Sequence, residues 1–534
     1  MADISSSDTI RDLVSLMRAH GITRCVACPG SRNSPIVASL AALPDFELRG
    51  ATDERSAGFL ACGWASATQS PVAVCVTSGS ALLNLHPAVA EASYRHLPLL
   101  IISADRPASW IGQQDGQTLP QPGAFGSLCR MSLQIPEAKE EHWHRNRLLN
   151  EAMLELRHRA GGPVHINIPL SEPLFGTTTE PLPTPRVIRR TELAKMTADE
   201  ETELLNTVAA CPRRLILLGQ LPADAQLPPI LAGEKAFAIV GEHLCNTAIA
   251  ITQPDAVLGT SPAADMSPDM LITYGGCIIS KRLKNLLRNT PPREHWHICP
   301  DGTVVDTFCG LTRVIEGDPA ELWELLAAFA DDGDEAYAAR WLKPTPVPQF
   351  PYSGMQLVGD LLGAMPRGSV LHLANSSTVR FAQFFPLPAD TQVECNRGVN
   401  GIEGSLSTAL GFAMGDSRLQ FIICGDLSFF YDMNALWLQG IPANVRILLL
   451  NNGGGGIFEF IPTPDHPLVN GCHHITATAW AESCGFECLS VKSECDWPAA
   501  LAALTSPGNR PVLVEAFTDS VADAALFTQF NSQY

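Results

Sequence analysis

Short apolar runs of strand length alternate with amphipathic helical stretches along the whole chain. Near the start, Ile10, Leu13, Val14 and Met17 fall on one face of a predicted helix, which Gly21 ends. The apolar runs that predict strands lie at residues 24–27, 71–76, 97–102, 164–168, 214–220, 235–241, 270–276, 295–302, 369–376, 419–425, 445–451 and 511–517. Strands that alternate with helices in this way predict parallel sheets with helices on both faces.

Two proline-rich segments divide this pattern into three blocks. One covers residues 176–186 (GTTTEPLPTPR), and the other covers residues 343–354 (KPTPVPQFPYSG). Their composition is typical of extended linkers, and 534 residues are too many for a single core. The sequence therefore predicts three doubly wound α/β domains with parallel sheets, at residues 1–178, 187–342 and 354–534.

Composition and charge narrow the classes of partner. Hydrophobic residues make up 46% of the chain and charged residues 17%, as in a well-packed globular protein. The net charge of −19 argues against binding to nucleic acid or to anionic membranes. No apolar run is long enough to span a membrane, and the N-terminal residues MADISSSDTIRDL lack the features of a signal peptide. We therefore expect a cytoplasmic protein.

The sixteen cysteines fit that expectation, because they are scattered through strand-like runs rather than arranged as a disulfide framework. Cys25 and Cys28 have the spacing of a redox pair, but buried thiols at a strand end are the favoured interpretation. The cluster around His473, with cysteines at 472, 484 and 488, matches no compact zinc motif. We assign no histidine a catalytic role.

The most specific motif of the third block joins two predicted strands. Residues 421–424 lead to Gly425 and Asp426, and residues 445–450 lead to Asn451 and Asn452. Parallel strands bring their carboxyl ends to one edge of a sheet, where ligands of open α/β sheets bind. Asp426, Asn452 and a glycine carbonyl would offer the oxygen ligands that Mg²⁺ prefers beside a phosphate. A turn Asp and a loop Asn without a ligand are the alternative, but the spacing favours a metal–diphosphate site.

This motif resembles that of the thiamine-diphosphate-dependent enzymes, which runs from Gly-Asp to a terminal Asn pair. These enzymes also use a glutamate that protonates the pyrimidine ring of the cofactor, and Glu54 in FELRGATDERSAG stands where they have it. Taken alone, Asp53, Glu54 and Arg55 suit a solvated first turn of a helix equally well. The resemblance implies thiamine diphosphate as cofactor, with Mg²⁺ or alternatively Mn²⁺ as the bridging metal.

The order of the three domains narrows the resemblance to the pyruvate oxidase and decarboxylase group. In that group the first domain holds the pyrimidine, the middle one is largely structural, and the third holds the diphosphate. CPGSRNSP (28–35), TDERSAGFLACG (52–63) and CNRGVNGIEGSLSTALG (395–411) are similar to one branch of it, which acts in menaquinone biosynthesis. The resemblance therefore implies a transferase that decarboxylates 2-oxoglutarate and adds the succinyl-semialdehyde carbanion to isochorismate.

The same resemblance implies a role for each matching residue. The catalytic set is Glu54, Arg380 and Arg397. The substrate-binding set is Ser31, Arg32, Arg106, Gln117, Lys281, Arg282, Ser376, Ile457 and Phe458. The cofactor-binding set is Glu54, Ser80, Asn375, Ile402, Gly425, Asp426, Leu427 and Ser428. The metal ligands are Asp426, Asn452 and the carbonyl of Gly454.

A physical argument supports the arginines of these sets. Both expected substrates carry two carboxylates, which a chain with a net charge of −19 repels on average. Guanidinium groups pair bidentately with carboxylates and create the local positive field that the pocket needs. Arg32, Arg106, Arg380 and Arg397 each follow a strand-like run. One arginine is more often a surface ion pair, but four at strand ends favour a dicarboxylate site.

Other functions stay open at this point. The nearest is another thiamine-diphosphate-dependent 2-oxo acid decarboxylase or an acetolactate-type carboligase, with smaller and less charged substrates. A cofactor-binding protein without catalysis would lack Glu54 or Asp426, and both are present. A nicotinamide dehydrogenase is disfavoured because no GxGxxG follows the first strand. The resemblance also implies a homodimer or a dimer of dimers, in which two chains hold each cofactor.

Overall fold

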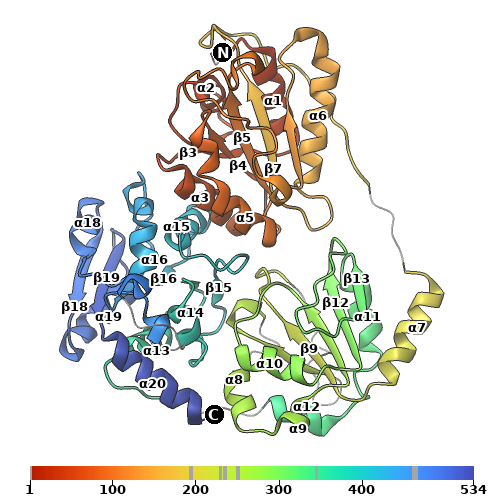
Figure 1. Cartoon of the computed structure of the whole chain (residues 1–534), viewed down its shortest axis with the longest axis vertical. Coiled ribbons are helices and arrows are strands. Elements are labelled where there is room, and N and C mark those ends of the chain that lie inside the picture. Colours follow the sequence, from red (N-terminus) through yellow and green to blue (C-terminus); the bar gives the residue numbers. More distant parts are fainter. Residues whose placement is uncertain are drawn as a thin grey trace.

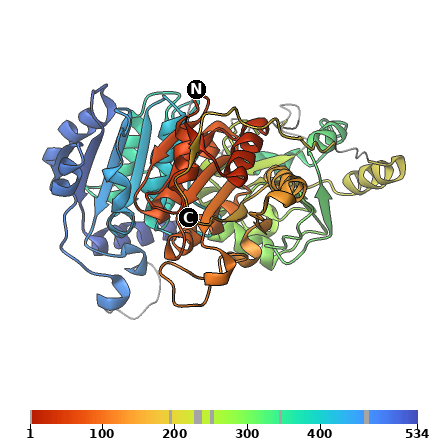
Figure 2. The same cartoon turned by 90° about the horizontal axis from the view of Figure 1, so that it is seen from above.

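Three parallel β-sheets, each flanked by helices, make up the protein, as the sequence predicts. The computed structural model describes residues 3–533 except 192–195, 226, 228–230, 232–236, 248–252, 343–346 and 460–466. In Figure 1 the first domain lies above the other two, which stand side by side, and Figure 2 shows this arrangement from above.

The first domain contains a six-stranded sheet in the order β3-β2-β4-β5-β7-β6. Its strands are β2 (Arg24–Ala27), β3 (Glu47–Gly50), β4 (Val72–Val76), β5 (Leu99–Asp105), β6 (Met131–Gln134) and β7 (Val164–Pro169). Its helices are α1 (Asp8–Ala19), α2 (Ser34–Ala41), α3 (Glu54–Thr68), α4 (Ser80–Leu83), α5 (His86–Tyr94) and α6 (His142–Glu155). Every residue of the central strands β4 and β5 is buried, because helices pack on both faces of the sheet.

The middle domain contains a five-stranded sheet in the order β10-β9-β11-β12-β13. Its strands are β9 (Arg214–Leu218), β10 (Ala238–Gly241), β11 (Met270–Tyr274), β12 (Glu294–Cys299) and β13 (Arg313–Glu316). Its helices are α7 (Ala198–Ala209), α8 (Pro254–Gly259), α9 (Ala263–Met266), α10 (Lys281–Asn289), α11 (Ala320–Ala327) and α12 (Glu335–Trp341). Alternate residues of β9 enter two different apolar cores, which shows that the sheet is covered on both faces.

The third domain contains a six-stranded sheet in the order β15-β14-β16-β17-β19-β18. Its strands are β14 (Val370–Leu373), β15 (Gln392–Glu394), β16 (Gln420–Gly425), β17 (Val445–Asn451), β18 (Glu487–Val491) and β19 (Val512–Phe517). Its helices are α13 (Gly354–Ala364), α14 (Ser377–Ala382), α15 (Ser405–Gly415), α16 (Asp426–Tyr431), α17 (Pro467–Asn470), α18 (Thr478–Ser483), α19 (Trp497–Thr505) and α20 (Ser520–Gln533). All neighbouring strands are parallel, so their carboxyl ends share one edge.

Helices α3 and α15 join the first domain to the third. Two glycines let their backbones touch: a Cβ atom at Gly63 would lie 1.9 Å from the carbonyl oxygen of Thr408, and one at Gly411 would lie 2.1 Å from that of Leu60. One apolar core continues across this contact. Because α3 begins at Glu54, the packing also fixes where that carboxylate stands against the third domain.

The first proline-rich segment lies along the first domain. β8 (Thr177–Thr178) pairs antiparallel with β1 (Ile4–Ser5). Further on, Ser15 Oγ donates to the carbonyl oxygen of Pro183 at 2.6 Å, and Asn150 Nδ2 donates to that of Arg186 at 2.9 Å. The second segment falls partly outside the described residues, at 343–346. The domain boundaries at 178, 187, 342 and 354 stay predictions.

The cysteines are free thiols, and Cys25 and Cys28 are buried, as predicted from the sequence. Within the described ranges, no three His, Cys, Asp or Glu side chains gather closely enough to hold a metal ion. In the same ranges no helix combines the length and the apolar character needed to cross a membrane.

Candidate active site

The predicted metal–diphosphate motif lies where two adjacent strands of the third sheet end. β16 and β17 are parallel neighbours, with Gly425 opposite Leu450. Asp426 therefore begins α16 directly beside the turn that follows β17. The sequence correctly predicts both strands and the shared edge to which they lead.

Backbone N–H groups surround the Asp426 carboxylate. Its Oδ2 accepts hydrogen bonds from the N–H groups of Asn452, Gly453 and Gly454, at 3.1, 2.8 and 3.0 Å, and its Oδ1 accepts one from Leu427 at 2.6 Å. Burial raises the pKa of this carboxyl, although these donors oppose the shift. The glycines are required, because Gly453 and Gly454 have φ angles of 78° and 159°.

The residues at this turn fit a divalent cation. Asn452 Oδ1 is buried and has no hydrogen-bond partner in the described structure, and a buried acceptor of this kind needs a ligand or water. It stands one residue before Gly453, whose N–H group already binds Asp426. One carboxylate with amide and carbonyl oxygens is the donor set that Mg²⁺ prefers when phosphate completes its shell.

His473 lies at the same carboxylate, although the sequence predicts no role for it. Its Nε2 is 3.4 Å from Asp426 Oδ2, and the imidazole is largely buried. The T-shaped contact of its ring with Phe430 on α16 holds it there. In the sequence, His473 stands out only through its neighbours Cys472 and His474. The structure places its imidazole beside the Asp426 carboxylate rather than in a cysteine cluster.

Asn375 and Ser428 hold the segment that contains two further predicted residues. Asn375 Nδ2 donates to the carbonyl oxygens of Asn396 and Gly401, at 2.6 and 2.7 Å. Ser428 Oγ on α16 donates to the carbonyl oxygen of Ile402 at 2.9 Å. The diphosphate end of the site and the segment with Arg397 and Ile402 therefore form one connected structure.

Arg380 and Arg397 are two positive charges close enough to influence each other. Arg397 is only 7% exposed and donates to Asn375 Oδ1 at 3.0 Å, and its Nε has no hydrogen-bond partner in the described part of the chain. Arg380 donates to the carbonyl oxygen of Ser376. Burial lowers the pKa of Arg380, and the charge of Arg397 lowers it further. Within the described residues neither guanidinium has a carboxylate within ion-pair distance, so this pair can accept an anion.

Glu54 stands at the first turn of α3, where its carboxylate accepts a hydrogen bond from Asn84 Nδ2 at 3.2 Å. Its neighbour Asp53 caps the helix by accepting from the N–H group of Arg55 at 2.9 Å. Asp53 also accepts from Asn434 Nδ2 of the third domain at 2.9 Å. Asp53 thus caps the helix and links it to the third domain, and the catalytic role of Glu54 stays a prediction.

The two first-domain arginines have their own partners. Arg32 Nη1 donates to the carbonyl oxygen of Leu170 at 2.9 Å and lies 3.2 Å from Glu172. Arg106 Nε lies 3.0 Å from Asp115. Both follow strands at the carboxyl edge of the first sheet, as predicted. Neither is an unpaired charge of the kind formed by Arg397, and their role in substrate binding stays a prediction.

The remaining predicted residues lie at element ends and turns. Four are exposed, namely Ser31, Ser80, Gln117 and Lys281. Five are partly buried, namely Arg282, Ser376, Leu427, Ile457 and Phe458. Ser376 has φ +77°, a strained conformation for a residue with a side chain, at the turn from β14 into α14. Such strain in a tight turn is typical of functional sites.

Comparison with known proteins agrees with this geometry. Residues 8–124 match the family described as the thiamine pyrophosphate enzyme N-terminal TPP binding domain, and residues 375–516 match the corresponding C-terminal TPP binding domain. A 2-succinyl-5-enolpyruvyl-6-hydroxy-3-cyclohexene-1-carboxylate synthase from Phocaeicola vulgatus is 48% identical over 98% of both chains. Synthases of the same name from Bacteroides thetaiotaomicron and Desulfotalea psychrophila are 47% and 39% identical, over 99% and 85% of this chain and 99% and 87% of theirs.

The matched segments contain Glu54 in the first domain and the stretch from Asn375 to Gly454 in the third. The full-length similarity extends through the middle domain as well. The chain therefore belongs to the 2-succinyl-5-enolpyruvyl-6-hydroxy-3-cyclohexene-1-carboxylate synthase family of thiamine-diphosphate-dependent enzymes.

Proposed function

We propose that this protein decarboxylates 2-oxoglutarate and adds the remaining four-carbon fragment to isochorismate. The product of this reaction is the compound after which the family is named. The observation that carries the proposal is the pair of half-buried Arg380 and buried Arg397, neither of which has a carboxylate within ion-pair distance in the described chain. Asn375 connects this pair to the segment that Ser428 of the Asp426 helix also holds. An anion pocket beside a metal–diphosphate site suits a 2-oxo dicarboxylate.

Each part of the site then has a task. Asp426, Asn452 and the Gly454 carbonyl would hold Mg²⁺, with Mn²⁺ as a substitute, and thereby the diphosphate. Glu54 would move a proton to and from the pyrimidine ring, and Arg397 and Arg380 would hold substrate carboxylates. Thiamine diphosphate, when bound, supplies the carbanion chemistry of decarboxylation and ligation. The free cysteines support a reducing compartment, so we propose that the protein works in the cytoplasm.

The reaction is tested by release of carbon dioxide from 2-oxoglutarate with thiamine diphosphate and Mg²⁺, measured with and without isochorismate. We expect release to depend on both cofactors and the product to contain both substrates. Acceptance of pyruvate as readily as 2-oxoglutarate would instead favour an acetolactate-type carboligase.

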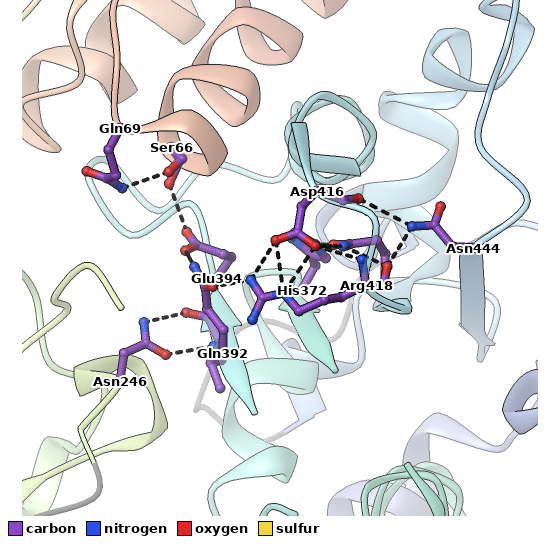
Figure 3. A network of polar contacts seen from close by, with 11 residues as sticks. Ser66, Gln69, Asn246, His372, Gln392, Glu394, Asp416, Arg418 and Asn444 are labelled. Atoms are coloured by element: carbon purple, nitrogen blue, oxygen red, sulfur yellow. Dashed lines mark hydrogen bonds and ion pairs between the residues drawn. The ribbon is translucent and has the colours of Figure 1, made fainter. Parts of the chain in front are cut away.

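Loss of either unpaired arginine should weaken catalysis with dicarboxylates. We expect Arg397→Ala and Arg380→Ala each to lower kcat/KM for 2-oxoglutarate more than about tenfold, because a charge-assisted hydrogen bond contributes ~1.5–3 kcal/mol. Arg418→Ala is the matched control, since Arg418 already pairs with Asp416 at 2.6 Å in the same domain (Figure 3). Equal effects of all three substitutions would contradict an anion site at the unpaired arginines.

We further propose a homodimer in which two chains complete each site. Within one chain Arg55, next to Glu54, donates to the carbonyl oxygen of Tyr431, the last residue of α16, whereas Asp426 is the first. Glu54 and Asp426 of one chain thus lie near opposite ends of that six-residue helix. Three large apolar side chains are exposed near this contact, as expected of a surface that a second copy covers. Tyr431 accepts the hydrogen bond from Arg55, Leu83 precedes Asn84, which binds Glu54, and Trp437 follows Asn434, which binds Asp53, by three residues.

Mixing two inactive variants tests the shared site. Glu54→Gln and Asp426→Ala chains should each be inactive, and subunit exchange should restore activity at hybrid sites with an intact first domain and an intact third domain. With equal mixing, one of the two sites in each mixed dimer regains both residues, so activity should reach about a quarter of wild type. If exchange is demonstrated by mass and no activity returns, each chain forms its site alone.

A further inference from the structure

A buried carboxylate of the first domain holds the segment that follows Arg397 of the third. Glu91 on α5 is 1% exposed. Its Oε1 accepts from the N–H group of Gly398 at 3.0 Å, and its Oε2 accepts from that of Val399 at 2.9 Å. A Cβ atom at Gly398 would lie 2.9 Å from Glu91 Oε2, so the close approach depends on glycine at this position.

The same helix holds the other end of the segment. Arg95, one turn after Glu91, donates to Glu394 Oε2 at 3.0 Å, and both side chains are largely buried. Burial alone would lower the pKa of Arg95, but the charges of Glu394 and Glu91 raise it above its usual value. The segment from Glu394 to Val399, which contains Arg397, is therefore held by α5 at both ends.

The middle domain contacts the same edge strand. Asn246 donates to the carbonyl oxygen of Val393 at 3.0 Å and accepts from its N–H group at 2.7 Å, which imitates a neighbouring strand. Gln220 donates to the carbonyl oxygen of Cys395 at 2.8 Å. Figure 3 shows the junction, where Ser66 of the first domain and Asn246 of the middle domain meet β15 of the third from different sides.

The orientation of the Arg397 guanidinium depends on this backbone. Its oxygen partner is Asn375 Oδ1, its Nε has no partner among the residues that the structure describes, and its Nη2 faces Cys277 Sγ at 3.8 Å. One side-chain hydrogen bond to an oxygen leaves a long arginine free to turn, unless its backbone is fixed on both sides. Burial of the Glu91 carboxylate carries a desolvation penalty, and the hydrogen bonds from the N–H groups of Gly398 and Val399 offset that penalty.

We propose that Glu91 is a positioning residue for Arg397, through which helix α5 of the first domain sets the affinity of the third domain for the substrate carboxylate. The inference rests on the proposed function of Arg397 as a carboxylate-binding residue. Glu91 itself touches no reacting atom. Its effect should appear in substrate affinity and should vanish when Arg397 is absent.

The test is a double-mutant cycle with Glu91→Gln and Arg397→Ala in the full-length protein. Glu91→Gln places an amide donor against one of the two N–H donors, so KM for 2-oxoglutarate should rise about tenfold, as expected for one charge-assisted bond. The change in kcat should stay within about threefold, and calorimetry should give an unchanged Kd for thiamine diphosphate with Mg²⁺. In the Arg397→Ala background, Glu91→Gln should change KM less than about twofold, because coupled residues are not additive.

Two further variants guard against a general loss of stability. Gly398→Ala displaces the same segment without changing the Glu91 charge and should reproduce the selective rise in KM. Ser66→Ala removes a 3.3 Å hydrogen bond to Glu394 at the same junction and should leave KM at the wild-type value. Parallel loss of cofactor binding and melting temperature in Glu91→Gln would indicate a purely structural role and overturn the proposal.

The cycle also separates failure of the positioning role from failure of the proposed function. Multiplicative effects of Glu91→Gln and Arg397→Ala, with normal wild-type turnover, would overturn the positioning role alone. Absence of 2-oxoglutarate turnover in the wild-type protein, with both cofactors bound, would overturn the proposed function and the inference that rests on it.

Discussion

Replacing Glu54 by glutamine should remove nearly all turnover while leaving the fold and cofactor binding in place. Glutamine keeps the length of the side chain and a hydrogen bond to Asn84, but it cannot transfer a proton. Since proton transfer by a positioned side chain contributes about 10²–10⁴-fold, we expect kcat to fall at least about 100-fold. Carbon dioxide release from 2-oxoglutarate measures turnover, and calorimetry measures binding of thiamine diphosphate.

Glu47→Gln is a suitable control for Glu54→Gln, because Glu47 is an exposed glutamate on β3 that pairs with Arg49 at 2.7 Å. It changes the charge of the chain equally, and its turnover should match wild type. Glu54→Gln turnover within a few-fold of wild type would show that another group activates the cofactor.

Buried central strands could be predicted from the sequence, whereas most edge strands could not. Apolar runs predict β4, β5, β16 and β17, which lie inside their sheets and have nearly every residue buried. The pattern does not show β3, β6, β13, β15 or β18, all of which are edge strands with exposed or half-exposed positions. An edge strand needs fewer apolar side chains, so its hydrophobic signal is weak.

β10 is an exception among the edge strands, and its burial explains why it could be predicted. It is an edge strand of the middle sheet, yet all four of its residues are buried, and its apolar run predicts it correctly. Burial rather than position in the sheet therefore decides whether a strand can be recognised from its sequence.

The candidate site divides in a similar way. Asp426 and Asn452 could be predicted because each directly follows a buried strand, and adjacent parallel strands end at one edge. Glu91 and Arg95 could not, because two opposite charges one turn apart on a helix are typical of a solvated face. Their partners, Gly398 and Glu394, lie about 300 residues away, at separations of 307 and 299 positions.

Local sequence also cannot show which arginines are already neutralised. Arg32 and Arg397 both follow strands and both are buried, but among the described residues Arg32 has a carboxylate within ion-pair distance, at Glu172, and Arg397 has none. That pairing depends on the path of the chain after β7, because Glu172 lies three residues beyond the end of that strand. The structure therefore distinguishes an arginine that already has a carboxylate partner from one that has none within ion-pair distance among the described residues.

Replacing Asp426 should abolish cofactor binding at ordinary concentrations. In Asp426→Ala the metal would lose its proposed charged protein ligand, and the N–H groups of Asn452, Gly453 and Gly454 lose the oxygen that aligns the turn. We expect affinity for thiamine diphosphate with Mg²⁺ to fall at least about 100-fold, since hydrogen bonds to charged groups contribute ~1.5–3 kcal/mol each and ~1.4 kcal/mol is tenfold. Calorimetry provides the Kd.

The effect should concern the metal rather than the fold. Burial raises the pKa of the Asp426 carboxyl, so its ionised form is disfavoured in the protein without metal, and Asp426→Asn removes that penalty while keeping one acceptor oxygen. Thiamine diphosphate with Mg²⁺ should raise the melting temperature of wild type but not of Asp426→Asn. Asp416→Asn, which breaks the ion pair with Arg418 elsewhere in the domain, should keep the cofactor-dependent rise. An unchanged Kd in both Asp426 variants would contradict the proposed metal site, because a metal that helped to hold the diphosphate would bind more weakly without the carboxylate, and the cofactor with it.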